Sequence, residues 1–244
     1  MTVQSGTMET IVPVWAQQSF LRAIWVEAGD TAESIAARTD ALLSKIGEVL
    51  KIDRWELPDG TTWEGDSPTL TEIVCHNAVR DEPRPDFPQG ELLIEYGYSF
   101  VLQGSGTAIK STVWVNAGHI AIGRKMPTHR LKVDLDEKVP GAVTSSIGDA
   151  VCAAIAETWK PANIMLTETI ANRVARRSNW KILVGYRTWI NATVGAVTQV
   201  AEGLTLTKLA GGALVSAPDD WPAERVVEAM TATLRANGLD EVPH

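Results

Sequence analysis

The stretch WKILVGYRTWINA, Trp180–Ala192, decides the fold class. It is rich in β-branched and aromatic residues, which suit a pleated surface, and only Gly185 interrupts it. Alternate side chains of a strand point to opposite faces, and both alternating sets are largely apolar here. The stretch is therefore predicted to be a strand that is buried on both faces near the middle of a sheet. Gly185 is predicted to let a neighbouring chain approach closely.

The N-terminal part of the chain predicts a strand, a turn and a helix. Phe20–Ala28 has the composition of a strand, and Gly29 follows as a turn residue. Asp30 with Glu33 three residues later resembles a capping box that begins a helix. Apolar residues then recur at helical spacing and form one stripe. The stripe consists of Ile35, Thr39, Leu42, Leu43, Ile46, Val49 and Leu50.

The remaining elements complete an α+β pattern. We expect a single domain over residues 19–244, with a mostly antiparallel mixed sheet and helices packed on it, preceded by a flexible N-terminal arm over residues 1–18. No linker is long enough to separate two domains. Helices are predicted around Leu70–Val79, Ser145–Glu157 and Pro161–Arg177, and after Pro222. A β-meander is predicted over Leu92–Glu137, in which Arg130–Asp136 is a strand with one solvent-exposed face. Two further strands are predicted at Gly203–Leu209 and Ala213–Ala217.

Composition places the chain among ordinary globular proteins. It has 244 residues, of which 45% are hydrophobic and 21% charged, and nine tryptophans stand against three tyrosines and three phenylalanines. The formal net charge of −8 disfavours general nucleic-acid affinity. Cys75 and Cys152 match no metal or redox spacing and suit a reducing compartment. The first residues do not form a signal peptide, and no run of about 18 apolar residues would span a bilayer, so a cytoplasmic protein without a membrane partner is expected.

Motifs for catalysis or cofactor binding are missing from the sequence. The four histidines form no H-x-x-x-H pair, and no G-x-S-x-G nucleophile motif or phosphate-binding glycine loop occurs. Gly104-Ser105-Gly106 is better explained as a hairpin turn. We therefore predict no catalytic, cofactor-binding or metal-binding residue, no cofactor, and a protein that is not an enzyme.

The segment Asp53–Glu95 is strongly acidic and rich in proline. It holds eleven acidic residues and three arginines. The difference, −8, equals the formal net charge of the whole protein. It is interpreted either as a solvated loop system or as a negatively charged docking surface for a basic partner, because charge of one sign accelerates association. In the second interpretation Trp63 is an anchor. The rim charges are then Asp59, Glu64, Asp66, Asp81, Glu82 and Asp86.

A basic run follows later in the chain. Arg173, Arg176, Arg177, Lys181 and Arg187 are not interrupted by an acidic residue between Glu168 and Glu202. The run could form an anion or nucleic-acid patch, or it could end a helix and pair with the acidic segment of the same chain. The second interpretation is favoured, because the aromatic residues that single-strand binders use are not interleaved with these charges.

Four pieces of the chain, in this order, resemble the immunity protein 52 family of bacterial polymorphic-toxin and type VI secretion systems. They are FLRAIWVEAGDTAESIAARTDALLSKIGEVL (20–50), ETWKPAN (Glu157–Asn163), VGYRTWIN (Val184–Asn191) and LAGGALVSAP (Leu209–Pro218). The resemblance implies a non-catalytic antitoxin. Such a protein neutralises a cognate toxin, commonly a nuclease, by direct protein contact. The matched residues are structural, so no binding residue is carried over from the family.

The sequence therefore favours an immunity protein that occludes a secreted toxin, with a basic nuclease domain as its partner and no direct contact with nucleic acid. Two alternatives stay open. One is an enzyme with a carboxylate-lined cleft, and the other is a structural subunit of a phage or secretion assembly.

Overall fold

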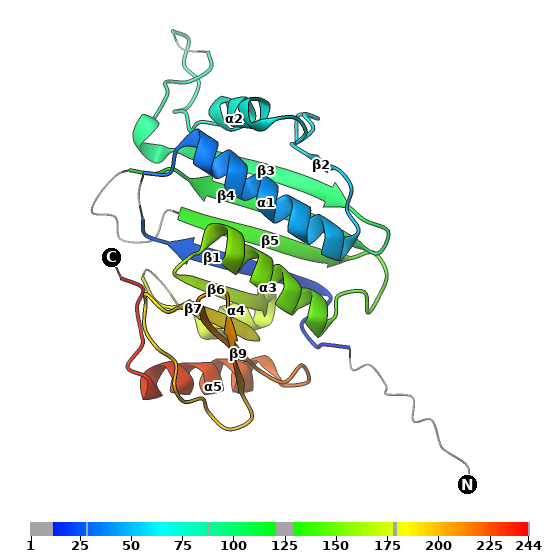
Figure 1. Cartoon of the computed structure of the whole chain (residues 1–244), viewed down its shortest axis with the longest axis vertical. Helices are drawn as coiled ribbons and strands as arrows, with labels where there is room; N and C mark the ends of the chain where they lie inside the picture. The colour runs from blue at the N-terminus through cyan, green and yellow to red at the C-terminus, as the bar shows by residue number, and fades with distance from the viewer. Residues whose placement is uncertain (1–11, 28, 87, 121–128, 178–179, 244) are drawn as a thin grey trace.

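A nine-stranded antiparallel sheet runs through the protein (Figure 1). The computed structural model describes residues 12–27, 29–86, 88–120, 129–177 and 180–243. Each neighbouring pair of strands is antiparallel, which confirms the α+β class and the antiparallel sheet. From edge to edge the strands are β2 (Trp55–Glu56), β3 (Tyr98–Ser105), β4 (Ile109–Ala117), β5 (His129–Glu137), β1 (Gln18–Trp25), β6 (Asn163–Glu168), β7 (Arg187–Asn191), β9 (Gly212–Ser216) and β8 (Thr205–Leu209).

Two long helices cover one face of the sheet. Helices α1 (Ala32–Leu50) and α3 (Ser145–Trp159) pack against each other across this face (Figure 1). Helix α2 (Ser67–His76) packs on α1 beside β3, and a 3₁₀ turn, η1 (Ile94–Tyr96), precedes β3. Helices α4 (Thr169–Ala175) and α5 (Ala223–Ala236) pack together at the β6–β7–β9 end.

The two ends of the sheet differ in how their faces are covered. In β4, Val113 and Val115 are fully buried, whereas Trp114 between them is 43% exposed. In β5, Leu131, Val133 and Leu135 are fully buried, as the predicted alternation requires. We call the face beneath α1 and α3 the covered face, and the opposite face of β3, β4, β5 and β1 the open face. At the β6–β7 end both alternating sets are buried.

The stretch Trp180–Ala192 is buried on both faces as predicted, but only its second half is a strand. Residues 182–190 are all buried, and β7 lies between β6 and β9, while β1 is the middle strand. In the first half, the side chain of Asn163 takes the place of a neighbouring strand. Its Oδ1 accepts from Leu183 N at 2.7 Å, and its Nδ2 donates to Leu183 O at 3.3 Å. A Cβ at Gly185 would lie 2.2 Å from Leu166 O, which confirms the predicted close approach.

The predicted helix Pro161–Arg177 is wrong in its first half. Asn163–Glu168 forms β6, and only Thr169–Ala175 is helical. The short apolar run after Pro161 has no decisive period. Pairing with β1 on one side and β7 on the other fixes it as a strand, because a buried backbone must satisfy its hydrogen bonds.

The N-cap of helix α1 lies one residue after the predicted cap. Thr31 is the N-cap, and its side chain accepts from Ser34 N at 3.2 Å. Asp30 instead forms an ion pair with Arg38 at 3.0 Å. The predicted apolar stripe is otherwise confirmed, with Val49 partly exposed.

The predicted flexible arm over residues 1–18 needs correction in its described part. Trp15 is fully buried, and its Nε1 donates to Asp219 Oδ1 at 3.1 Å. Val14 N also donates to Asp219 O at 3.0 Å. Burial of a large indole fixes this part of the chain, because the area that the ring removes from water is large. Residues 1–11 lie outside the described residues.

The remaining predictions match the structure with shifted bounds. The helix expected at Leu70–Val79 is α2, and the final predicted helix is α5. The strand-like Leu92–Leu102 divides into η1 and β3, because Gly97 adopts φ +63° between them. The late strands appear as β8 and β9 on either side of Gly211.

Candidate partner-binding surface

The acidic segment, residues 53–95, builds the β2–β3 edge of the molecule. It supplies β2, α2, η1 and the loops between them (Figure 1). Two of its arginines pair locally, Arg54 with Glu56 at 2.7 Å and Arg84 with Asp81. Nine of its eleven carboxylates have no ion-pair partner among the described residues. This edge therefore carries a negative charge that the protein does not neutralise.

Two of the predicted rim charges have structural roles. Asp59 Oδ1 accepts from Thr61 N at 2.9 Å and holds the turn, and this hydrogen bond lowers the pKa of Asp59. Asp66 is the N-cap of α2 and accepts from Thr69 N at 3.1 Å and from Thr69 Oγ1 at 2.6 Å. Both hydrogen bonds lower the pKa of Asp66, and the bond from the Thr69 side chain has the larger effect. Both carboxylates are exposed, and both are needed by the local backbone.

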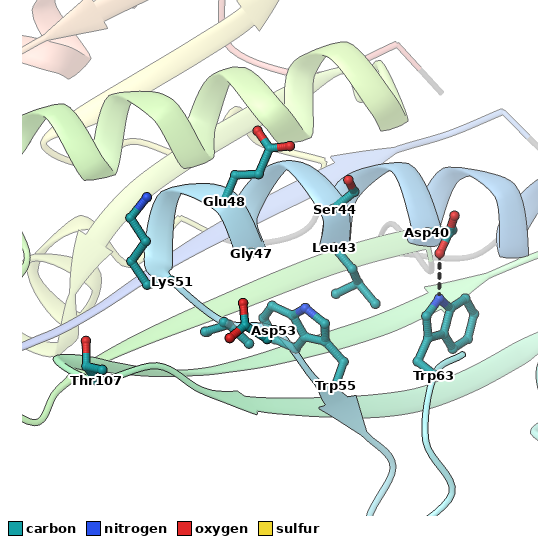
Figure 2. A pocket seen from close by; sticks show the side chains of 11 residues that line it. Asp40, Leu43, Ser44, Gly47, Glu48, Lys51, Asp53, Trp55, Trp63 and Thr107 are labelled. Carbon is teal, nitrogen blue, oxygen red and sulfur yellow. Dashed lines mark hydrogen bonds between the residues drawn. The ribbon is translucent and has the colours of Figure 1, made fainter. Parts of the chain in front are cut away.

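A groove runs between α1 and the chain that follows it (Figure 2). It encloses about 770 Å³. Asp40, Glu48 and Asp53 line it with Lys51, so its charged side chains sum to −2, and the indoles of Trp55 and Trp63 form one wall. We call it the α1 groove.

The helical repeat puts the acidic residues of α1 on one side of the groove. Asp40, Ser44 and Glu48 are spaced by four residues and therefore follow one line along α1. Gly47 lets the returning chain lie against the helix, because a Cβ there would be 2.7 Å from Ile52 O. The sequence did not lead us to predict Asp40, Glu48 and Trp55 as site residues. The four-residue spacing from Asp40 through Ser44 to Glu48 was nevertheless visible in it.

Trp63 forms a wall of the fold rather than an exposed anchor, which corrects the predicted role. It is 7% exposed. Its Nε1 donates to Asp40 Oδ1 at 3.2 Å (Figure 2), and its ring stacks on Phe100 with centroids 5.8 Å apart. A tryptophan held this way contributes to stability, and only its edge is available to a partner.

Exposed apolar side chains gather instead at the end of the acidic segment. Leu92, Ile94 and Tyr96 are 42%, 69% and 36% exposed, and Ile120 is 49% exposed. Ile120 N donates to Glu95 O at 3.1 Å, which joins Ile120 to this group. We call these four residues the apolar tip; the chain before it projects beyond α2 (Figure 1).

Carboxylates lie beside the apolar tip. Asp81 N donates to Glu91 O at 2.9 Å, so residues 81–82 run beside the tip. Asp81 therefore lies beside Glu91, two residues before Leu93, and Glu95 lies within η1 at the tip itself, whereas Asp86 is exposed further along the loop. The other predicted group, Asp59, Glu64 and Asp66, precedes α2, which is ten residues or about 15 Å long. The predicted rim is therefore two separate groups.

The basic run does not pair with the acidic segment, contrary to the favoured interpretation. Arg177 pairs with Asp240 at 3.1 Å, and Lys181 pairs with Glu241 at 2.9 Å. Arg187 pairs with Asp149 and Asp219, at 2.6 and 3.1 Å. These partners lie close in space although they are distant in sequence, which only the fold could establish.

Other chemical groups are dispersed. Within the described ranges, no three His, Cys, Asp or Glu side chains are grouped so that they could hold a metal ion. Cys152 is buried, which raises the pKa of its thiol to about 12, whereas Cys75 is exposed on α2. None of the helices in the described part of the chain is both long and apolar enough for a membrane span.

Comparisons with known proteins leave the family open. No protein-family model matches the chain, and no curated protein matches it. The chain is similar to a solved structure, the Pseudomonas aeruginosa T6SS protein PA0821, with 11% identity and a TM-score of 0.49. The alignment covers 93% of this chain and 78% of that chain. A likeness at this level carries no argument about function, so membership of the immunity protein 52 family stays a prediction.

Proposed function

We propose that this protein is a non-catalytic inhibitor of the immunity-protein kind, which binds a basic, secreted toxin and blocks its active surface. The observation that carries the proposal is the apolar tip with the carboxylates of Glu91 and Glu95 beside it, which have no ion-pair partner among the described residues. Protein interfaces combine an apolar centre, which supplies most of the binding energy, with a polar rim. Here the centre is Leu92, Ile94, Tyr96 and Ile120, and the rim is acidic.

The charge of the edge supports a basic partner. Unpaired carboxylates create a local negative potential that steers a positively charged protein and raises the association rate at low ionic strength. A nuclease domain is positive where it binds nucleic acid, so it is complementary to this edge. An interface of standard size, about 1,600 Å² in total, would extend from the tip over the flank of α2.

The test starts from the neighbouring reading frames. Co-expression with an adjacent toxin should restore growth, and the purified pair should form a stable complex. Replacing Ile94 with Asp should weaken the complex by at least about tenfold, since it places a charge in the apolar centre. Val139→Asp is the matched control, because Val139 is 51% exposed and its N donates to Ala108 O in the β3–β4 hairpin, at the opposite end of β3 from the tip. Equal effects of both substitutions would remove the tip from the interface.

Association kinetics test the electrostatic part separately. Reversing Glu82, Asp86 and Glu91 to Lys should slow association with the toxin by about tenfold at low salt, and the effect should shrink at high salt. Asp59 and Asp66 are left unchanged because their loss would damage the turn and the helix cap. The control reverses Asp136, Glu224 and Glu228, which carry the same total charge and are exposed elsewhere. Unchanged rates would reject electrostatic steering even if the protein still gives immunity.

The α1 groove is the observation that favours the enzymatic alternative. Its three carboxylates, Asp40, Glu48 and Asp53, line one concave site, as a carboxylate-dependent hydrolase requires. The purified protein should then turn over a hydrolase substrate, and Glu48→Gln should abolish the turnover without unfolding the protein. Turnover that depends on Glu48 would replace the inhibitor proposal.

A further inference from the structure

The open face of the sheet holds a shallow, basic depression. It encloses about 260 Å³ and is lined by Arg22 on β1, Trp114 and Asn116 on β4, and Arg130 and Lys132 on β5. The strand register sets these side chains beside one another. Lys132 lies directly between Arg22 and Trp114 on the neighbouring strands, and Arg130 lies opposite Asn116.

The cations of the depression exceed its anions. Lys132 Nζ pairs with Asp134 at 2.6 Å, and Trp114 Nε1 donates to the other oxygen of Asp134 at 2.9 Å. Arg22 and Arg130 have no carboxylate within ion-pair distance among the described residues. Three cations against one carboxylate leave a local charge of +2, in a protein whose formal net charge is −8.

This arrangement is unfavourable for the protein alone. Like charges that face each other across antiparallel strands repel, and Arg22 and Lys132 are such a pair. Partial burial first, and then the positive charge of Arg130, lower the pKa of Arg22, while Asp134 acts in the opposite direction. The ring of Phe20 offers partial compensation, with the Arg22 guanidinium 5.6 Å and Lys132 Nζ 4.9 Å from its centroid.

A bound oxyanion would supply the missing charge. We propose that the depression binds the phosphate group of a small phosphorylated molecule. A phosphate monoester carries a charge of about −1.5 to −2 near neutral pH, which balances the local +2, whereas one carboxylate would balance half of it. Guanidinium groups bind phosphate through paired N–H donors. Asn116 Oδ1 accepts from Ser99 Oγ at 3.0 Å, which leaves its amide N–H groups as further donors.

Calorimetric titration tests the site with two probes at constant ionic strength, inorganic phosphate and adenosine 5′-monophosphate. Both should bind saturably to the intact protein, and sulfate should compete. Arg130→Gln and Arg22→Gln should each weaken binding by about tenfold or more, since each removes a charge-assisted contact. Lys110→Gln is the matched control, because Lys110 is exposed on the open face of β4, outside the depression. Its Kd should stay within about twofold of the wild type.

Three outcomes would overturn the proposal. Absence of saturable binding of both probes up to tens of millimolar would remove the site. Acetate that binds as tightly as phosphate would assign the depression to carboxylates, such as those of an acidic protein partner. Binding of a single-stranded oligonucleotide without binding of the two small probes would assign it to nucleic acid. Arg130 is exposed, so its substitution leaves the test valid even if Arg22→Gln fails to fold.

Discussion

Arg187 on β7 and Arg22 on β1 are two arginines of one sheet with opposite surroundings. Arg187 is 4% exposed, and every side of its guanidinium has an acceptor. Its Nε donates to Asp149 at 2.6 Å, Nη2 to Asp219 at 3.1 Å, and Nη1 to the carbonyl oxygens of Tyr186 and Ala217 at 3.2 and 3.0 Å. Arg22 is partly buried beside two other cations, and no described carboxylate pairs with it.

The difference distinguishes an arginine that stabilises the fold from an arginine that is available to bind a ligand. A buried guanidinium that is surrounded by acceptors joins β7 to α3 and to the loop after β9, and its loss leaves those acceptors without donors. A partly buried guanidinium without a carboxylate contributes little to the fold, so it is free to bind a ligand. Three substitutions sharpen or break this comparison, and they follow from the largest expected effect to the smallest.

Replacing Arg187 with Met should have the largest effect. We expect the free energy of unfolding to fall by about 3 kcal/mol, because Asp219 would be left partly buried without its cation. The exposed half of Asp149 is solvated and adds little to this loss. Urea denaturation gives the value. Arg173→Met on the exposed side of α4 is the control and should cost less than about 0.5 kcal/mol. A loss below about 1 kcal/mol for Arg187→Met would refute the structural role.

His129 is a third basic group of the sheet, and burial favours its neutral form. Its ring stacks on Trp25 with centroids 5.6 Å apart, and its Nε2 is 3.0 Å from His119 O. Burial lowers the pKa of His129, while the hydrogen bond to His119 and the charge of Asp30 act in the opposite direction. The unfolded chain then binds the proton more tightly than the folded chain. The stability that the neutral His129 contributes should therefore be fully present above a pH of about 6.5, and it should be lost as the pH drops below that value.

Denaturation at pH 7.5 and at pH 5.5 measures this dependence. His129→Gln, which keeps an N–H donor, should lose less stability between the two pH values than the wild type loses. His76→Gln on the exposed side of α2 should keep the wild-type dependence. Equal pH dependence in all three proteins would exclude His129 as the titrating group.

Replacing Arg22 with Met should have the smallest effect, and its sign should be opposite to that of Arg187. We expect the free energy of unfolding to stay unchanged or to rise by up to about 1 kcal/mol. The variant removes repulsion from Lys132 and Arg130, and it loses only the contact with the Phe20 ring and a distant attraction to Asp134. The same urea titration applies. A loss of more than about 1 kcal/mol would mean that Arg22 is structural, and it would erase the contrast with Arg187.

Local patterns in the sequence predicted much of the fold. The alternation of Leu131, Val133 and Leu135 with charged residues gave the correct covered face of β5, because the strand period of two is set by backbone geometry. The four-residue recurrence in α1 gave its buried stripe for the same kind of reason. Strand β6 was missed, because four apolar residues between Pro161 and Thr167 fit a helix or a strand equally well until their neighbours are known.

The candidate surfaces were predicted less completely. The acidic segment was visible as composition, and the hydrogen bond from Asp81 N to Glu91 O brings Asp81 beside the chain that leads to the apolar tip. Trp63 was given the wrong role, because composition does not tell a buried indole from an exposed one. Exposure of Leu92 and Ile94 could not be predicted either, since apolar residues in a strand-like run are expected inside a sheet.

The sequence by itself determined that this protein is an α+β fold, with a double-sided buried stretch before Ala192 and an excess of negative charge in residues 53–95. These properties depend on the order of side chains along short segments. Only the tertiary structure decided which charges are neutralised. Asp149 and Asp219 reach Arg187 from positions 38 and 32 residues away, whereas Arg22, Lys132 and Arg130 converge without enough partners. Electrostatic pairing depends on distance in space, and strand order in the sheet sets that distance.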